Sequence, residues 1–471
     1  MNSIIRFLSN KGINTIDATF YTRIEMWNSW YVSNVRGFSS YKIYTGKGTY
    51  TRRRRKSLGM AKVVSEDLAD LLLNEKVLIT LSDSVTEKYV ESVFKNNNFK
   101  TLGNEYQERK AATGTVAYVP YIYDMLMHED GRILSGKIGI NYVSAKDIYP
   151  VSWNNGTISE VVFAFRRTFR RQKYIHMQYH HIVDDQYVIE NMVTTGGTNE
   201  GHELTPDKWK QLKPFRDLER KIETGSLEPQ FVIDKLNKVN NADEDESNPM
   251  GIALFANSID VLKSIDTKYD SYSNEFELGR KRIFVAPELI TDVDGSPAFD
   301  PEDGVFYMLP NDYAKEQNGL IKEIDMPLRT EDHSRAINDD LNYLSMKCGF
   351  GTERYKFERG QVKTATEVIS VNSDMFRTLK KHEIILDDAI KQLIRIVIRL
   401  GIVIGEPLNI DSDITIKFDD SIIEDKNAER ESDRKDVAMG AMPLEEYRAK
   451  WYGETETEAK GNIQETAEVI E

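Results

Sequence analysis

The chain has 471 residues, of which 40% are hydrophobic and 29% charged, and its formal net charge at pH 7 is −14. This composition excludes wholesale disorder, and the length exceeds what one hydrophobic core usually serves. The negative charge excludes tight non-specific binding to DNA, because such binding comes mostly from neutralising phosphates. The single cysteine, Cys348, excludes a disulfide within the chain.

The first hundred residues favour helices interrupted by a basic run. Residues 16–31 mix aromatic and polar side chains and predict a short helix on a domain surface. The run Arg52–Lys56 has two interpretations. It contacts phosphate or nucleic acid, or it is a solvated loop or a partner for acidic neighbours in an assembly, and we favour the second interpretation. Helices are then predicted over residues 65–73, with Ser65 as the N-cap, and over residues 85–96.

The middle of the chain favours strands. From residue 114 to residue 193 the apolar residues alternate with polar ones, and turn signals such as Asn154-Asn155-Gly156 separate the runs. We therefore expect a β-rich meander. Residues 195–250 are polar, with a weak helix near residues 208–212. Residues 240–249 contain no large apolar side chain and predict a linker.

A helix, an insert and a second helix follow the linker. Between residues 252 and 280, apolar residues recur at spacings of three and four, which predicts a helix roughly 40 Å long that packs on other helices. Residues 281–329 are rich in proline and predict short strands at 282–285 and 305–309. A second helix is predicted over residues 331–348. This layout projects a small module on two helical legs.

The last part of the chain favours another long helix over residues 366–400 and a strand over residues 413–418. The most apolar stretch, residues 384–404, contains five charged residues, which argues against a transmembrane helix. The segment from residue 426 onward is highly charged and is predicted to be helical.

No sequence motif indicates catalysis. The chain has no phosphate-binding loop, no G-x-G-x-x-G motif after a strand and no paired-cysteine zinc spacing. Two weaker patterns remain possible metal sites, although a polar strand face and a solvated edge strand are the preferred interpretations. The histidine pattern comprises His176, His180 and His181. The acidic pattern would suit a metal-dependent nucleic-acid-processing enzyme, the alternative function, and comprises Asp411, Asp413, Asp419 and Asp420.

Three segments resemble the portal proteins of tailed phages, in particular those of siphoviruses that infect Gram-positive bacteria. The first runs from Ile140-Asn141-Tyr142-Val143 through Ile148-Tyr149-Pro150 to Trp153-Asn154-Asn155-Gly156. The second is Asn248-Pro249-Met250-Gly251 with the helix that follows. The third is Lys363-Thr364-Ala365-Thr366-Glu367-Val368, after a basic loop. Their order and spacing agree with the predicted layout of two helices around an insert.

The resemblance implies an α+β portal fold with an α/β wing, two long stem helices, a small α/β clip insert, a tunnel loop, a long helix and a short helical crown. The implied regions are the wing at 1–250 and 368–425, the stem helices at 251–280 and 330–349, the clip at 281–329, the tunnel loop at 350–367 and the crown at 426–471.

The resemblance also implies the function. Such a protein is a structural component of the virion rather than an enzyme, and it needs no cofactor and no metal. It forms a homo-oligomeric ring, commonly a dodecamer, at one vertex of the capsid, after assembly in the host cytoplasm and without a membrane. Its expected partners are the double-stranded DNA in its channel, the large terminase subunit, the head–tail adaptor, and the major capsid and scaffolding proteins.

The tunnel loop is the expected point of contact with DNA. Its basic residues form a local positive cluster in an acidic chain, and repeated around a ring they would give belts of positive charge. Gly349 and Gly351 would allow the loop to move. The alternative is an exposed loop whose cations pair with acidic neighbours. The predicted contact residues are Arg354, Lys356, Arg359 and Lys363.

Overall fold

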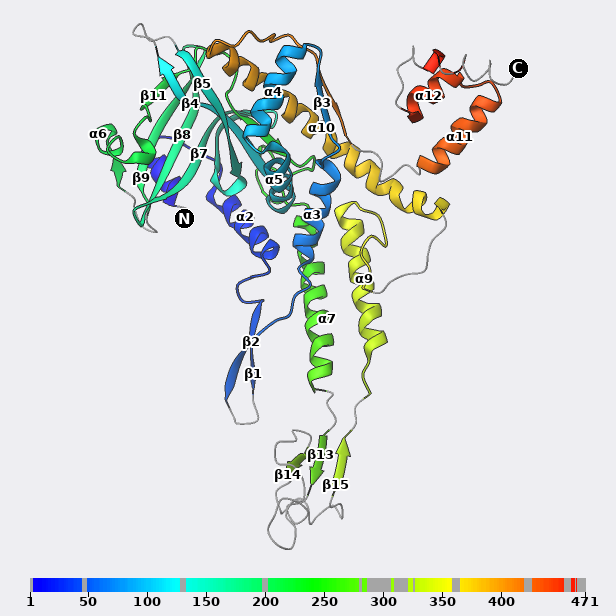
Figure 1. Cartoon of the computed structure of the whole chain (residues 1–471). Coiled ribbons are helices and arrows are strands. Elements are labelled where there is room, and N and C mark those ends of the chain that lie inside the picture. The colour runs from blue at the N-terminus through cyan, green and yellow to red at the C-terminus, as the bar shows by residue number, and fades with distance from the viewer. Residues whose placement is uncertain are drawn as a thin grey trace, which may run out of the picture.

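The computed structural model describes residues 3–44, 49–127, 133–196, 202–278, 282–285, 306–308, 321–324, 327–357, 365–418, 426–452, 459–461 and 463. A broad body of sheets and helices carries two long helices, α7 (Ile259–Leu278) and α9 (Thr330–Cys348), that run side by side to a small distal sheet (Figure 1). The expected mixture of helices and sheets in an α+β fold is confirmed.

Helices form the N-terminal part of the body. They are α1 (Ser3–Asn10), α2 (Ala18–Tyr31), α3 (Met60–Leu72), α4 (Ser84–Asn96) and α5 (Phe99–Thr113). The prediction that a helix begins at Ser65 is wrong, because α3 begins five residues earlier and buries Ser65, whose hydroxyl donates to the carbonyl of Ala61. The predicted helix at 85–96 is confirmed and is capped by Asp83, whose carboxylate accepts from the Thr86 N–H.

The predicted meander forms two antiparallel sheets. The smaller has the order β12-β4-β5, from β4 (Thr115–Met127), β5 (Ile133–Ser144) and β12 (Val232–Lys235). The larger has the order β10-β9-β8-β7-β6, with β11 also paired to β9. Its strands are β6 (Ile148–Asn154), β7 (Thr157–Phe169), β8 (Gln172–Val183), β9 (Gln186–Thr195), β10 (Glu203–Leu204) and β11 (Lys221–Glu223). Short helix α6 (Pro206–Trp209) agrees with the weak helix expected near residue 208.

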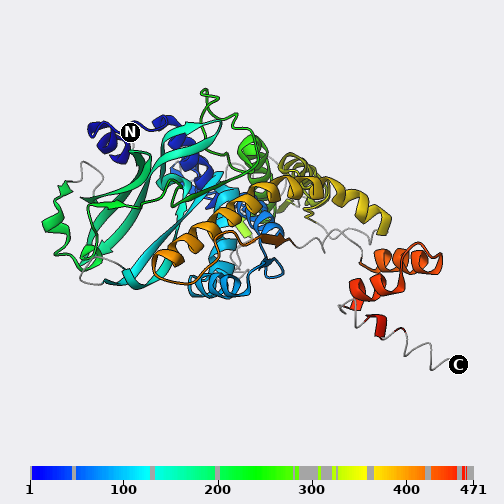
Figure 2. The same ribbon diagram turned by 90° about the horizontal axis from the view of Figure 1, so that it is seen from above.

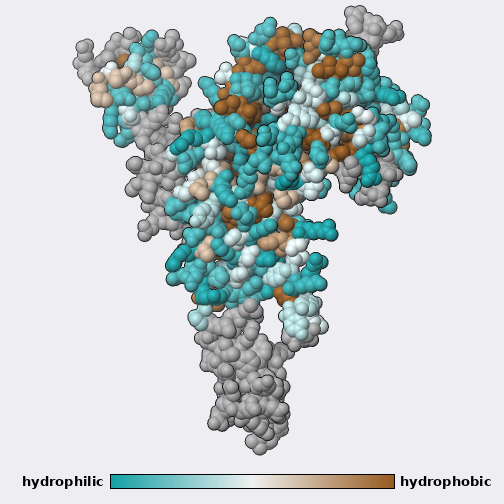
Figure 3. Space-filling model, turned by 180° about the vertical axis from the view of Figure 1, so that it is seen from behind, coloured by the Kyte–Doolittle hydropathy of each residue, from teal (hydrophilic) through white to brown (hydrophobic). Residues whose placement is uncertain are grey.

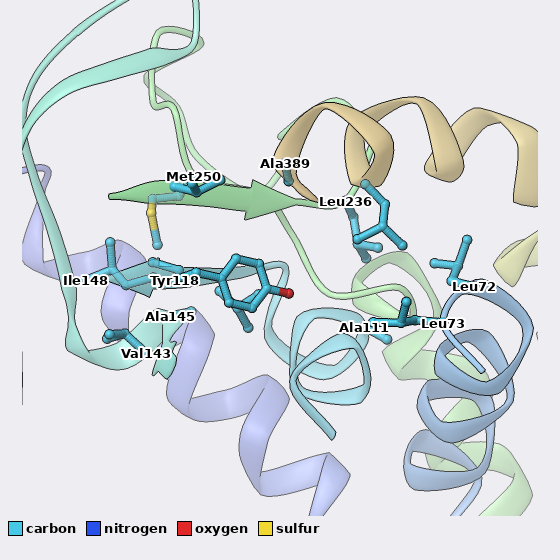
Figure 4. Packing of buried hydrophobic residues seen from close by; sticks show 14 of the residues in the cluster. Leu72, Leu73, Ala111, Tyr118, Val143, Ala145, Ile148, Leu236, Met250 and Ala389 are labelled. Atoms are coloured by element: carbon cyan, nitrogen blue, oxygen red, sulfur yellow. The ribbon is translucent and has the colours of Figure 1, made fainter. Parts of the chain in front are cut away.

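The main hydrophobic core lies between the smaller sheet and the surrounding helices. Tyr118 and Val143 from the sheet, Leu72 from α3 and Ala389 from α10 (Ala365–Val403) point toward this region (Figure 4). Burial of such side chains contributes about 25 cal/mol for each Å² of apolar surface removed from water. Segments that are distant in the sequence therefore form one hydrophobic core in the body.

A buried polar network crosses this core. Lys110 on α5 donates to Asp234 on β12 at 2.9 Å, and both side chains are almost fully buried. Gln107 donates to the other carboxylate oxygen at 2.7 Å and to the Tyr118 hydroxyl at 2.8 Å. Because buried charges are costly unless paired, this network fixes α5 against the sheet.

The first long helix is shorter than its apolar stripe suggests. Helix α7 spans Ile259–Leu278, whereas residues 252–255, which belong to the stripe, are buried in the body without helical structure. The Gly251 N–H donates to the Thr115 hydroxyl and the Leu254 N–H to the Ala111 carbonyl, so the body satisfies this segment's backbone. A Cβ on Gly114 would lie 2.3 Å from the Gly251 carbonyl oxygen, which explains the glycine pair at this crossing.

The second long helix, α9 (Thr330–Cys348), agrees closely with the prediction. The distal sheet between the two helices has the order β14-β13-β15, from β13 (Arg282–Val285), β14 (Phe306–Met308) and β15 (Ile321–Ile324). Strands β13 and β14 match the two expected strands and pair in parallel, whereas β15 was not predicted.

The remaining elements complete the body and a small C-terminal helical unit. Strand β16 (Ile414–Lys417) agrees with the predicted strand and pairs with β3 (Leu78–Leu81), which was not predicted. Helix α10 crosses the body, and α11 (Lys426–Ala438) and α12 (Leu444–Tyr452) lie to one side of it (Figure 2). The strands of the basic hairpin, β1 (Ser40–Tyr44) and β2 (Tyr50–Arg54), project beside α7 (Figure 1).

Candidate functional site

The pair of helices α7 and α9 is the most distinctive part of the molecule. Leu262 and Ile265 on α7 and Ile337, Leu341 and Leu344 on α9 are all buried. These residues recur at spacings of three and four, so each helix buries one narrow stripe. The pair thus stands out from the body, and each helix covers the apolar stripe of the other.

Ion pairs fix the two helices at several heights. Lys268 on α7 lies 2.8 Å from Asp340 on α9, and Lys347 lies 3.4 Å from Asp260 nearer the body. At the far end Glu275 lies 2.9 Å from Arg329 and 3.1 Å from His333. Hydrogen bonds from Arg329 and then from His333 lower the pKa of the Glu275 carboxyl to about 2. The charges thus set the alignment of the helices along their common axis.

The basic run at residues 52–56 lies beside α7, on the side opposite to α9. Arg53 and Lys56 both bind Glu277, at 2.8 and 2.9 Å. Arg55 lies over the rings of Phe38 and Tyr41, at 4.5 and 4.9 Å from their centroids. The solvated loop that we favoured for this run is wrong, because Tyr50–Arg54 form strand β2. Arg53 and Lys56 do pair with an acidic neighbour, but it belongs to the same chain.

Two buried carboxylates of α7 fix the chain that follows the hairpin. Asp270 accepts from the Tyr41 hydroxyl at 2.7 Å and from the Lys56 N–H at 3.0 Å, and Asp266 accepts from the Leu58 N–H at 3.1 Å. Burial raises the pKa of Asp266. These positions were not predicted as functional, although their spacing of four on a helix is a signal that the sequence contains.

The loop after α9 carries the predicted DNA-contact residues, and the structure places two of them. Arg354 donates to both carboxylate oxygens of Asp67 on α3, at 3.0 and 2.5 Å, and this contact raises the pKa of the guanidinium. Lys356 lies 3.4 Å from Glu353. Arg359 and Lys363 lie outside the described residues. Both cations that can be placed therefore pair with carboxylates of the same chain.

The described part of this loop is fixed to its surroundings. The Glu353 and Phe357 N–H groups donate to the side-chain oxygens of Asn342 and Asn338 on α9, at 3.0 and 2.6 Å. The Tyr355 hydroxyl donates to Asp67 at 2.8 Å. Gly349 ends α9 with a φ of +86°, so the expected permissive backbone is present there. The loop is thus fixed as far as residue 357.

The histidine pattern does not form a metal site among the described residues. His176 and His180 are buried on one face of β8, as their spacing predicts, and His181 stacks on Tyr179. His176 shares a hydrogen bond of 2.8 Å with Asn191. His180 lies against the rings of Phe163 and Phe231. Burial lowers the pKa of His176 to about 4 and that of His180 to about 3, so both are neutral core residues at pH 7.

The acidic pattern around β16 likewise holds no cluster of metal ligands in the part of the chain that the structure describes. Asp411 and Asp413 are exposed, and their N–H groups bond to Asn409 and Ser82. Asp419 and Asp420 lie outside the described residues. The described geometry is that of an exposed edge strand paired with β3.

The comparisons with known proteins identify the family. No helix in the described ranges has the length and apolar content needed to cross a membrane. No curated protein matches the chain. A family model described as "Phage portal protein, SPP1 Gp6-like" matches residues 10–470. Because this match covers nearly all of the sequence, the chain belongs to the phage portal protein family of the SPP1 Gp6-like type.

Proposed function

We propose that copies of this phage portal protein close into a ring around a channel, at one vertex of the capsid, through which DNA is packaged and ejected. The family gives the chain its role in the virion as a portal and connector. The main support for this proposal is the α7–α9 pair. Two ion-paired helices that leave the body together are suited to line a channel when they are repeated around an axis. A ring of the family's usual size, a dodecamer, is the expected assembly.

The regions of the chain take the roles expected from the family. We assign residues 1–250 and 368–425 to the wing, 251–280 and 330–349 to the stem, 281–329 to the clip, 350–367 to the tunnel loop and 426–471 to the crown. Within the stem, the helical part begins at Ile259 of α7, since residues 252–255 pack in the body. Electron microscopy of the purified protein tests these assignments together.

The clip is proposed to be the docking module for the terminase motor and, after packaging, for the head–tail adaptor. Strand β13 follows α7 in the chain and strand β15 precedes α9, so the clip lies at the free end of the helix pair. Substitutions in the clip should abolish attachment of terminase or adaptor and leave the ring intact. Normal packaging and tail joining by several such variants would refute the assignment.

The chain is proposed to act without its own catalysis, since the portal family is structural. Purified protein should hydrolyse no ATP and cleave no DNA in the presence of Mg²⁺. The described surroundings of Asp411 and Asp413 offer nothing that favours the alternative of a metal-dependent enzyme. An ATPase or nuclease activity that is lost when residues of this chain are substituted would contradict the proposal.

The tunnel loop is proposed to contact DNA in the channel, with its cations divided between two roles. Arg354 fixes the base of the loop through Asp67, and Lys356 pairs locally. We propose Arg359 and Lys363, the other two cations of the predicted cluster, as the phosphate contacts. The double variant Arg359→Gln/Lys363→Gln should alter packaging or DNA retention in intact rings.

Arg354→Gln serves as the matched variant for this experiment. It removes one cation from the same loop, but its effect should be on the anchoring of the loop, seen as faster hydrogen exchange at residues 350–357. A map that places the loop on the outer surface of the ring, away from the axis, would refute the DNA contact.

A further inference from the structure

The outward face of the basic hairpin has no acidic partner within the described residues. In the antiparallel pairing of β1 and β2, Lys42 lies directly opposite Arg52, and Tyr44 lies opposite Tyr50. All four side chains are exposed, as is Arg54. None of the three cations forms an ion pair with a described residue, whereas Arg53 on the other face binds Glu277. The hairpin is thus fixed to α7 on one side and presents a cationic, aromatic face on the other.

This outward face is unfavourable in an isolated chain. Like charges directly opposite each other on two strands destabilise the pairing. Tyrosine and arginine side chains are also enriched where protein surfaces associate. The rings of Tyr44 and Tyr50, which meet edge to face with centroids 5.3 Å apart, are among the most exposed aromatic groups of the described chain. Both features are typical of a surface that is covered in an assembly.

The far face of α9 has the opposite charge. Asp332, Arg335 and Asp339 recur at spacings of three and four, and all are exposed. They lie on the side of the helix turned away from the buried residues Ile337 and Leu341 that face α7. Asp332 and Asp339 form no ion pair within 4 Å inside the described part of the molecule. This face, with two carboxylates and one guanidinium, is net acidic.

Helix α7 lies between the hairpin and α9. The outward face of the hairpin and the far face of α9 lie at the same level along the axis of α7. Asp270 and Glu277 bind the hairpin, whereas Lys268 and Glu275 bind α9 on the opposite side. The hairpin and α9 accordingly flank α7 in Figure 1. In the view from behind, hydrophilic residues dominate this narrow part of the molecule, and hydrophobic residues gather mainly over the body (Figure 3).

We propose that the hairpin of one copy docks on the far face of α9 of the next copy, with Lys42, Arg52 and Arg54 against Asp332 and Asp339. The proposal rests on the ring proposed above. Rotation about an axis parallel to the helix pair leaves each residue at its own height, so patches of opposite charge at equal height on opposite sides of α7 meet in neighbouring copies. A contact between two different faces is the kind that closes into a ring.

Charge reversal tests the proposal with full-length protein. Arg52→Glu/Arg54→Glu and, separately, Asp332→Lys/Asp339→Lys should each lose most of the ring in native mass spectrometry at physiological salt, because they place like charges in contact. Combining all four substitutions should restore the ring. Arg52→Glu also places a carboxylate opposite Lys42, so the hairpin should stay folded, which circular dichroism and the unfolding midpoint will check.

The matched control is Lys208→Glu/Arg216→Glu, which reverses two exposed cations of the body and should leave the ring unchanged. Rings of normal abundance from both charge-reversed hairpin and helix variants would overturn the docking while leaving the proposed ring in place. Wild-type protein that forms no ring would instead contradict the proposed function. Intact rings that lose binding to duplex DNA on substitution of Arg52 and Arg54 would identify the hairpin face as a nucleic-acid surface and would also overturn the docking.

Discussion

The body and the α7–α9 pair bury their apolar surface to different extents. In the body, sheets and helices from distant parts of the sequence enclose a core in which many side chains are fully buried, and even the charges of Lys110 and Asp234 are paired inside it. In the helix pair, each helix covers only one stripe of the other, and Phe276, Tyr343 and Met346 remain exposed. The core of the body is enclosed within one chain, whereas the helix pair leaves large apolar side chains exposed.

Breaking the buried network should have the largest effect on the body. Asp234→Leu leaves the Lys110 ammonium without its counterion in the core. Removing one partner of a buried ion pair costs about 3–5 kcal/mol, so the free energy of unfolding from urea titration should fall by that amount. Glu223→Leu removes the partner of the exposed Lys221 and should change nothing measurable. Equal effects of the two substitutions would show that the network does not support the body.

A cavity in the helix pair should act locally. Leu344 is fully buried on α9, and Leu344→Ala should cost about 2–4 kcal/mol at that site. Hydrogen exchange should therefore speed up in α7 and α9, while the main unfolding midpoint stays nearly unchanged. Leu393→Ala, at a fully buried position of α10, should instead lower the main midpoint. A global loss from Leu344→Ala would mean that body and helix pair unfold as one unit.

Acid should destabilise the body through its neutral histidines. The pKa of His180 is lowered from 6.5 to about 3 in the folded chain, so the unfolded chain binds the proton more tightly. The stabilising effect of the neutral form is therefore complete above pH 6.5 and declines as the pH falls toward 3, by about 1.4 kcal/mol per pH unit.

His180→Phe tests this pH dependence. Neither ring nitrogen of His180 has a hydrogen-bond partner among the described residues, and its neighbours Phe163 and Phe231 are aromatic. The variant should therefore lose less stability than the wild type between pH 6 and pH 4, as measured by urea unfolding at each pH. His202→Phe, at an exposed position, should keep the wild-type slope. An unchanged slope in His180→Phe would contradict a buried, neutral His180.

The smallest effect is expected where the hairpin meets α7. Arg53→Gln removes one of the two cations on the exposed carboxylate of Glu277, and Lys56 remains in place. Because exposed ion pairs contribute little, the unfolding midpoint should not move. Hydrogen exchange at residues 40–54 should rise modestly, and more so at low salt than at high salt. Unchanged exchange in this segment would mean that Asp270 and the Lys56–Glu277 pair fix the hairpin without Arg53.

Segments with strong apolar periodicity were predictable, and segments whose buried faces are polar were not. Helix α9 follows its stripe closely, as does α10. Helix α5 was missed because its buried face includes Gln107 and Lys110 instead of an apolar stripe. Residues 252–255 have helical spacing, but Leu254 bonds to α5 and the preceding Gly251 bonds to β4, which only the fold reveals.

The candidate site was predictable as a local charge pattern, without its partners. The basic loop at residue 354 and the basic run at residue 52 can both be read from the sequence. That Arg354 binds Asp67, and that Arg53 binds Glu277, depends on how distant elements pack. The orientation of the hairpin cations that have no acidic partner among the described residues depends on the same packing, as does the acidic face of α9 on the opposite side of α7.

The most direct test of the account is an electron-microscopy map of the purified full-length protein. It should show a closed ring of copies in which the α7–α9 pairs surround an axial channel, the distal sheets form one end, and each β1–β2 hairpin contacts α9 of the next copy. Particles that are only monomers or dimers, or rings in which the helix pairs lie away from the channel axis, would contradict the account.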